Sequence, residues 1–71
     1  MYMKIFAERL KELRTEKELS QVNLAKAVNL SKTAIAQWEL EKRTPNAEAV
    51  VELAKFFGVS ADYLLGITDD C

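Results

Sequence analysis

The stretch from Asn29 to Arg43, NLSKTAIAQWELEKR, contains the side chains of this chain that are best suited to hydrogen bonding with another molecule. If a helix begins at Lys32, then Thr33, Ala36 and Gln37 lie on one side of it and Lys32 lies at the rim. A helix face that meets only solvent normally holds several charges. This face instead holds a hydroxyl, a methyl and an amide, which can enter a groove and bond its polar edges.

The chemistry of these side chains fits the edges of nucleic-acid bases. A glutamine amide can pair with adenine N6 and N7, a threonine hydroxyl can bond several bases, and an alanine methyl can contact the thymine methyl. We therefore predict base contacts from Lys32, Thr33, Ala36 and Gln37. The alternative is an ordinary solvent-exposed helix face.

Three further residues are candidates for binding phosphates. Gln21 would begin the preceding helix, where its amide and the free backbone N–H groups can hold an anion. Lys42 and Arg43 would follow the helix as a basic pair that can neutralise phosphates. Simple solvation is the alternative for Gln21, and a helix dipole favours cations near a C-terminus in any case.

Helix signals recur along the whole chain, and no run of residues alternates as in a strand. An apolar stripe predicts a first helix from about residue 3 to residue 17. Good N-cap residues then place helices at residues 21–28, 32 to about 42, 47–57 and 61–65; these caps are Ser20, Ser31, Asn46 and Ser60. Because the connections are short, the sequence predicts an all-α, compact five-helix bundle.

Residues 21–42 are predicted to form a helix-turn-helix unit. Its two short helices are separated only by a dipeptide that begins with Asn29, so they must cross at a steep angle. Asn29 would take the left-handed conformation that ends the first helix, in place of the usual glycine. Ile35 and Trp38 lie opposite the candidate base-contacting side chains, so we predict that they support this face from the core.

The composition argues against several classes of function. The chain has 71 residues, enough for one domain, 1–71, with a single core. It has no histidine, one cysteine (Cys71) and no glycine-rich phosphate loop, so we expect no enzyme, metal or cofactor. No window approaches the roughly 20 apolar residues of a membrane span, and the lone cysteine suits a cytoplasmic location; we expect no membrane partner.

Charge is distributed unevenly along the chain. The formal net charge is −1, but residues 1–43 carry nine basic and six acidic side chains, whereas residues 44–71 carry one basic and five acidic ones. Such asymmetry can focus a positive field on one side of a nearly neutral molecule. The net acidity therefore does not exclude a nucleic-acid partner.

The segment LSQVNLAKAVNLSKTAIAQWELEKRTPN, with FAERLKELRTEK before it and VVELAKFFGVSADYLLG after it, resembles the phage-repressor (Xre/Cro-type) helix-turn-helix domains. The resemblance covers about residues 5–66. It implies a lambda-repressor-like fold and a sequence-specific transcriptional regulator, here interpreted as a repressor. Such regulators act as homodimers, on a palindromic operator, with the third helix in the major groove of double-stranded DNA. The resemblance also implies an ion pair between Arg14 and Glu39.

The apolar residues between positions 63 and 67 indicate self-association. Tyr63, Leu64, Leu65 and Ile67 are more apolar side chains than a short terminal helix can hide. We therefore predict that Tyr63, Leu65 and Ile67 contribute to a dimer interface, next to a C-terminal tail at residues 67–71. A fully packed C-terminal cap is the alternative.

Two other functions remain open from the sequence. One is an antitoxin-like module whose main partner is a protein and whose DNA binding is secondary. The other is a structural interaction domain that kept the fold without the groove contacts. The sequence also leaves open whether the chain is the N-terminal part of a longer regulator.

Overall fold

The computed structural model describes residues 2–71 and contains five α-helices, with no strand among these residues. The helices are α1 (Tyr2–Glu16), α2 (Gln21–Val28), α3 (Lys32–Glu39), α4 (Ala47–Phe57) and α5 (Ala61–Leu65). The predicted all-α class and the order of the helices are confirmed. None of these helices is long and apolar enough to cross a membrane.

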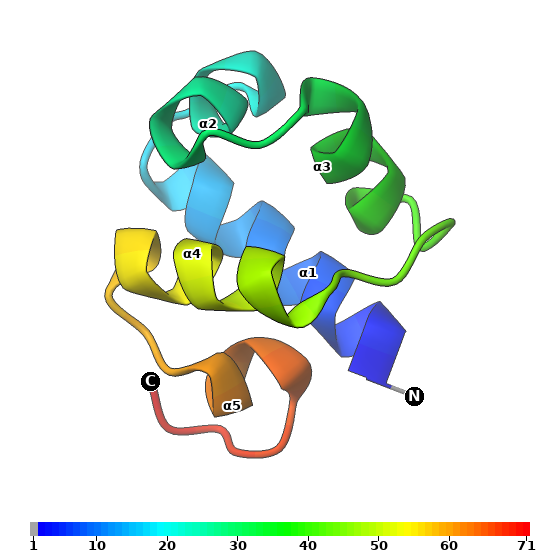
Figure 1. Cartoon of the computed structure of the whole chain (residues 1–71). Helices are drawn as coiled ribbons and strands as arrows, with labels where there is room; N and C mark the ends of the chain where they lie inside the picture. Colours follow the sequence, from blue (N-terminus) through cyan, green and yellow to red (C-terminus); the bar gives the residue numbers. More distant parts are fainter. Residues whose placement is uncertain (1) are drawn as a thin grey trace.

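The helices are arranged in layers (Figure 1). α1 and α4 cross the middle of the molecule, α2 and α3 lie on one side of them, and α5 lies on the other. α1 contacts α3 and α5, and α4 contacts α2 and α5. The molecule measures 28 × 24 × 20 Å along its principal axes. In this arrangement the helix-turn-helix pair rests on α1 and α4 and has its other side free.

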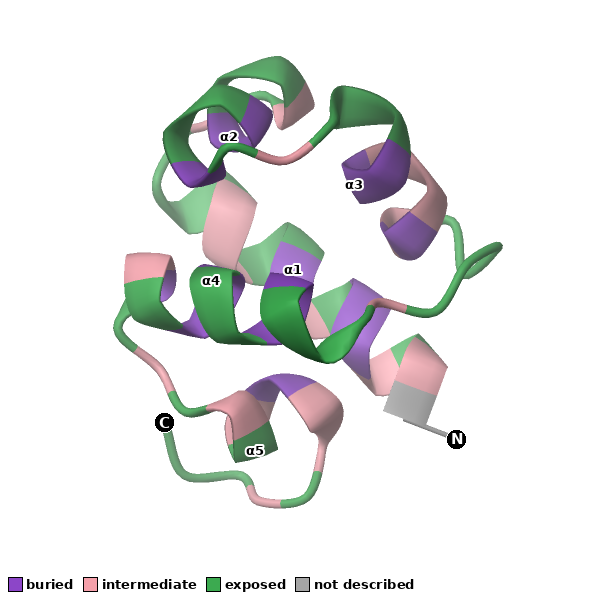
Figure 2. Cartoon of the chain, in the orientation of Figure 1, coloured by how far each residue is buried: buried purple, intermediate pink, exposed green. Residues whose placement is uncertain are grey.

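Every helix contributes at least one fully buried side chain to a single core. These side chains are Phe6 and Leu10 of α1, Leu24 of α2, Ile35 of α3, Leu53 of α4 and Leu64 of α5. Figure 2 shows the buried stretches facing the interior, while the outer sides of the helices are exposed or intermediate. Because burial of apolar surface is the main stabilising contribution, this shared core fixes the rotation of α3 about its axis.

Four helices begin at the residues that the sequence marks as N-caps. Ser20, Ser31, Asn46 and Ser60 have extended backbone, and each side-chain oxygen accepts a hydrogen bond from the backbone N–H three residues later. These bonds measure 2.8–3.0 Å. A cap of this kind contributes about 1 kcal/mol to helix stability, so local sequence defines where these helices begin.

The end of α3 differs from the prediction. The sequence predicted a helix to about Lys42, but α3 ends at Glu39. Glu41 has a left-handed backbone with φ of 61°, and the N–H of Lys42 donates to the carbonyl of Gln37 over 2.9 Å. This pattern closes a helix as a Schellman motif does, although glycine is the usual residue at its left-handed position. The prediction failed because a glutamate gives no signal for this conformation.

The segment predicted as a C-terminal tail, residues 67–71, folds back onto the domain. The Arg9 guanidinium donates to the carbonyls of Tyr63 and Thr68 and pairs with the Asp69 carboxylate. Gly66 has φ of 81°, and a Cβ placed there would lie 2.9 Å from methyl carbons of Ile5. A glycine is therefore required at this position both by its backbone conformation and by the close approach of α1.

Candidate nucleic-acid interface

α3 has two chemically different sides. Ile35 is fully buried and Trp38 is 5% exposed, and the Trp38 indole packs edge-on against the Phe6 ring with 6.1 Å between centroids. On the other side, Lys32 and Thr33 are exposed to solvent. Edge-to-face aromatic pairs of this geometry are favourable, so the indole anchors the helix while its polar side faces outward.

The remaining candidate base-contacting residues are less exposed to solvent. Ala36 and Gln37 are half-buried, so only part of each side chain reaches solvent. Leu40, at the C-terminal end of the same side, is 64% exposed. The outer surface of α3 thus offers a hydroxyl, part of an amide and two apolar groups, with one cation at its N-terminal end.

The turn between α2 and α3 is built by Asn29. Its backbone is left-handed, with φ of 57° and ψ of 42°, and its N–H donates to the carbonyl of Ala25. The N–H of Leu30 donates to the same carbonyl over 2.9 Å. Asparagine tolerates this conformation better than most non-glycine residues, so α2 can end here and α3 can begin after two further residues.

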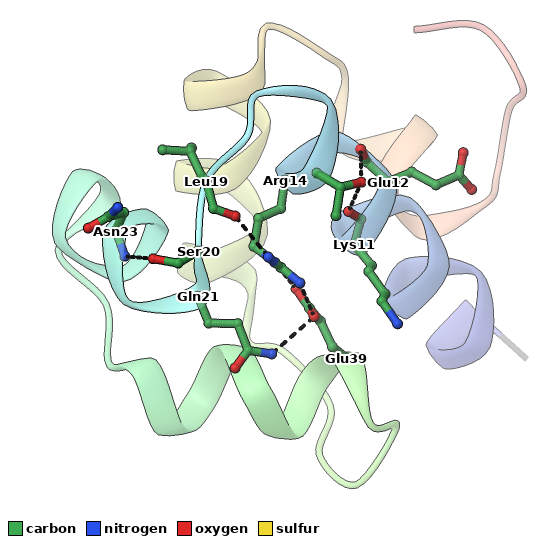
Figure 3. A network of polar contacts seen from close by, with 9 residues as sticks. Lys11, Glu12, Arg14, Leu19, Ser20, Gln21, Asn23 and Glu39 are labelled. Carbon is green, nitrogen blue, oxygen red and sulfur yellow. Dashed lines mark hydrogen bonds and ion pairs between the residues drawn. The ribbon is translucent and has the colours of Figure 1, made fainter.

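Arg14, Glu39 and Gln21 form a hydrogen-bonded network that joins α1, α3 and the first residue of α2 (Figure 3). The Arg14 guanidinium donates to Glu39 through Nε at 2.7 Å and through Nη2 at 3.0 Å. A third bond goes from Nη1 to the Leu19 carbonyl, at 2.8 Å. The Gln21 amide nitrogen donates to Glu39 Oε1 at 3.1 Å. Both ends of the helix-turn-helix unit are therefore tied to α1 through one carboxylate.

The pair at the centre of this network lies away from solvent. The side chains of Arg14 and Glu39 are 13% and 5% exposed. Hydrogen bonding to Glu39 raises the pKa of the Arg14 guanidinium above its usual value, and the negative charge of Glu39 adds to this effect while burial opposes it. Arg14 therefore remains charged wherever the domain is folded, and the two-pronged geometry fixes how α1 and α3 dock.

The charges around the helix-turn-helix unit favour an anion on its outer side. Lys42 and Arg43 are exposed in the loop that follows α3, where they outnumber the exposed Glu41 beside them. The first turns of α2 and α3 contain no acidic residue, whereas α4 and α5 carry Glu48 and Asp62 there. Lys32 even occupies the first position of α3, where the helix dipole disfavours a cation. A bound anion would offset the unfavourable interaction between the Lys32 charge and the helix dipole.

A helix-turn-helix family model matches residues 10–64 of this sequence. This chain belongs to the phage-repressor (Xre/Cro-type) helix-turn-helix family. The match includes all of α2, α3 and α4, together with the network around Glu39. The resemblance inferred from the sequence motifs is therefore confirmed.

Named regulators are among the relatives of this helix-turn-helix domain. It is 47% identical over 60 residues to the transcriptional activator BcrR of Enterococcus faecalis, covering 84% of this chain and 29% of that protein. It is 37% identical over 65 residues to repressor protein C2 of Salmonella phage P22, covering 92% of this chain and 30% of C2. The chain thus spans less than two thirds of the length of these relatives.

A solved structure has the same architecture as this helix-turn-helix domain. It is the restriction-modification controller protein C.AhdI from Aeromonas hydrophila, with a TM-score of 0.79 and 31% identity. The alignment covers 87% of this chain and 94% of the controller protein. The likeness therefore extends well beyond the helix-turn-helix unit, which is less than a third of this chain.

Some contacts of the predicted site residues were not predicted from the sequence. The bond between Gln21 and Glu39 joins residues 18 positions apart, and no periodic pattern marks it. The sequence predicts only a phosphate as the partner of Gln21, whereas its amide also has a partner within the domain. The stacking of Arg9 over the Tyr63 ring, 4.1 Å from the centroid, was also missed, and it occupies one face of a predicted dimer residue.

Proposed function

We propose that this chain binds double-stranded DNA sequence-specifically as a homodimer and acts as a transcriptional repressor. α3 lies in the major groove, where Lys32, Thr33, Ala36 and Gln37 contact base edges. Two copies place their α3 helices in successive major grooves, about 34 Å apart, on a palindromic operator. Occupation of a promoter then excludes the polymerase.

The observation that carries this proposal is the orientation of α3. The helix buries Ile35 and Trp38, and it directs a hydroxyl and a cation into solvent. Short polar side chains on an exposed helix suit a groove because they reach base edges without repelling phosphates. The membership of the chain in a family with named transcriptional regulators supports the same function.

Phosphate contacts position the domain on the duplex in this proposal. Gln21 stands at the N-terminus of α2, and Lys42 and Arg43 stand in the loop beyond α3. The Gln21 amide bonds Glu39, the last residue of α3, and Lys42 and Arg43 follow that residue in the chain, so these side chains can hold the DNA backbone near the C-terminal end of α3. Contacts of this kind fix register and orientation and carry no base preference of their own.

Substitution separates the two kinds of contact. Gln37→Ala should reduce binding to the cognate site by about 1–3 kcal/mol and relax the preference at one base pair. Arg43→Ala should weaken binding to all sequences about equally and lower the salt slope by about one unit. Both are measured by selecting bound sites from a random oligonucleotide pool and titrating the recovered duplex at several salt concentrations. An unchanged base preference in Gln37→Ala would contradict the assignment of this face.

The wild-type salt dependence tests the function as a whole. Binding to a random duplex should weaken steeply with salt, with log K falling by about 0.9 per neutralised phosphate for each decade of salt concentration. A flat response, or no binding to any sequence in the pool, would rule out the groove-reading function and favour a module whose partner is a protein.

The homodimer is supported by apolar surface on α4 and at the end of the chain. An open groove there is lined by Pro45, Ala47, Val50, Val51, Ala61 and Leu65. Val51 is 44% exposed and Ile67 is 71% exposed. Leu65 packs partly against the core, and Tyr63 is half-buried beneath Arg9. Self-association would remove this apolar surface from water.

Charged substitutions on the exposed part of this surface test the homodimer. The double variant Val51→Lys/Ile67→Lys should raise the dimer dissociation constant at least about tenfold, because a charge must then be desolvated in the interface. Sedimentation equilibrium measures this constant, and urea unfolding checks that the fold is intact. A wild-type chain that sediments as a monomer at every concentration would refute the dimer.

A further inference from the structure

We propose that Glu39 is a positioning residue, which holds the Gln21 amide in the orientation that binds a DNA phosphate. Arg14 supports this role by neutralising the Glu39 carboxylate. The inference rests on the proposed function, and it adds two partly buried residues to the phosphate-binding machinery. Neither of them needs to touch DNA.

The chemistry of the Glu39 carboxylate fixes which end of the amide faces it. An ionised carboxylate only accepts hydrogen bonds, so it selects the amide nitrogen of Gln21 and turns the amide oxygen away. Figure 3 shows this oxygen pointing away from Glu39. One N–H of the amide is used by Glu39, and the second N–H is left to donate. Phosphate oxygens are acceptors, so this second N–H is the group that they require.

Holding the amide before binding increases its contribution to affinity. A glutamine side chain has many rotamers, and freezing them on contact with a ligand opposes binding. Gln21 is half-buried and already bonded at 3.1 Å, so part of this ordering is achieved when the domain folds.

The Arg14 guanidinium makes an acidic positioning residue compatible with DNA. A carboxylate next to a phosphate would repel it, more strongly where solvent is excluded. Glu39 is 5% exposed, and Arg14 donates to both of its oxygens. The pair is therefore close to neutral as a unit. In this geometry Glu39 keeps its capacity to accept a bond from Gln21 without presenting a net negative charge to the backbone.

The first experiment observes the Gln21 side chain without DNA. In 15N-labelled wild-type protein, the Gln21 amide should be more ordered than the Gln37 amide, for which the described residues offer no hydrogen-bond partner. Arg14→Met/Glu39→Leu replaces the pair with apolar groups, a change that often leaves stability nearly unchanged. This double variant should shift and disorder the Gln21 amide and leave Gln37 unaffected. A Gln21 amide as mobile as Gln37 in the wild type would overturn the inference.

The second experiment measures coupling in DNA binding, using a duplex recovered by selection from a random pool. In the wild type, Gln21→Ala should weaken binding about tenfold, which is typical of a hydrogen bond to a charged group. In the Arg14→Met/Glu39→Leu background the same substitution should cost less than about threefold, because the amide is no longer oriented. Arg43→Ala is the matched control and should weaken binding equally in both backgrounds, since among the described residues no hydrogen bond joins the Arg43 side chain to Arg14, Glu39 or Gln21.

The outcomes separate the inference from the proposed function. Equal losses for Gln21→Ala in both backgrounds, or no loss in the wild type, would overturn the positioning role even though DNA is bound. If the selection recovers no bound duplex, the proposed function fails and the phosphate role fails with it. The order of the Gln21 amide would then still decide whether Glu39 orients this side chain.

Discussion

Arg14→Ala is expected to destabilise the domain by about 3–5 kcal/mol. The substitution leaves the Glu39 carboxylate 5% exposed and without its cation, with only the Gln21 amide donating to it. It also removes the bond to the Leu19 carbonyl that holds the connection between α1 and α2. For a chain of 71 residues the whole free energy of unfolding is roughly 4–10 kcal/mol, so this variant should be close to unfolding at 25 °C.

Asp69→Ala is the matched control for Arg14→Ala, since it also removes one member of an arginine–carboxylate pair. Arg9 and Asp69 approach to 2.8 Å, but the Asp69 side chain is 98% exposed. An exposed pair of this kind contributes about 1 kcal/mol at most. Urea unfolding followed by circular dichroism measures both variants. Similar losses for the two would show that burial does not set the contribution of the Arg14 pair.

The double variant Arg14→Met/Glu39→Leu separates two effects: the cost of leaving Glu39 without its cation, and the contribution of the ion pair itself. Removing both charges leaves no charged group without its partner, so the free energy of unfolding of this variant should lie within about 2 kcal/mol of the wild-type value. The contrast with Arg14→Ala would show that the pair specifies how α1 and α3 dock more than it adds stability. It would also make the variant a sound background for the DNA-binding measurements above.

Much of the fold could be predicted from the sequence because its signals are local. A serine or asparagine before an apolar periodic run marks a helix start, as Ser20 and Asn46 do. Asn29 likewise marks the turn, because few residues tolerate its left-handed conformation. Such signals need only a few neighbouring residues to be interpreted. They were sufficient for the all-α class, the order of the helices and the buried side of α3.

Most of the parts that the sequence did not predict depend on contacts between distant residues. The Arg9 side chain reaches carbonyls 54 and 59 positions away, and this contact holds the predicted tail against the domain, although most of its residues stay exposed. The Gln21–Glu39 bond requires the particular crossing of α2 and α3. The Arg14–Glu39 pair could be inferred from the sequence only through the family resemblance. The early end of α3 depends on a glutamate in a conformation that it rarely adopts.

Trp38→Ala is expected to lower the free energy of unfolding by about 3–5 kcal/mol, because it removes a large buried ring and leaves a cavity. It also removes the edge-on contact with Phe6 that anchors the inner side of α3. Trp38→Phe should cost less, since a ring remains to fill most of the space, and this variant remains measurable if the alanine variant does not fold. Trp38 is the one tryptophan of the chain, so unfolding of these variants is followed by circular dichroism rather than by fluorescence.

Leu40→Ala, two residues further on, is the control that makes Trp38→Ala decisive. Leu40 is 64% exposed on the outer side, so its truncation should change stability by about 0.5 kcal/mol at most. If the two substitutions lower the free energy of unfolding by the same amount, α3 is rotated away from the orientation described above. Thr33 and Gln37 would then not face a groove, and the proposed DNA-binding surface would be lost with them. If only the tryptophan variant is destabilised, the indole holds the helix from inside while its outer side is free to bind.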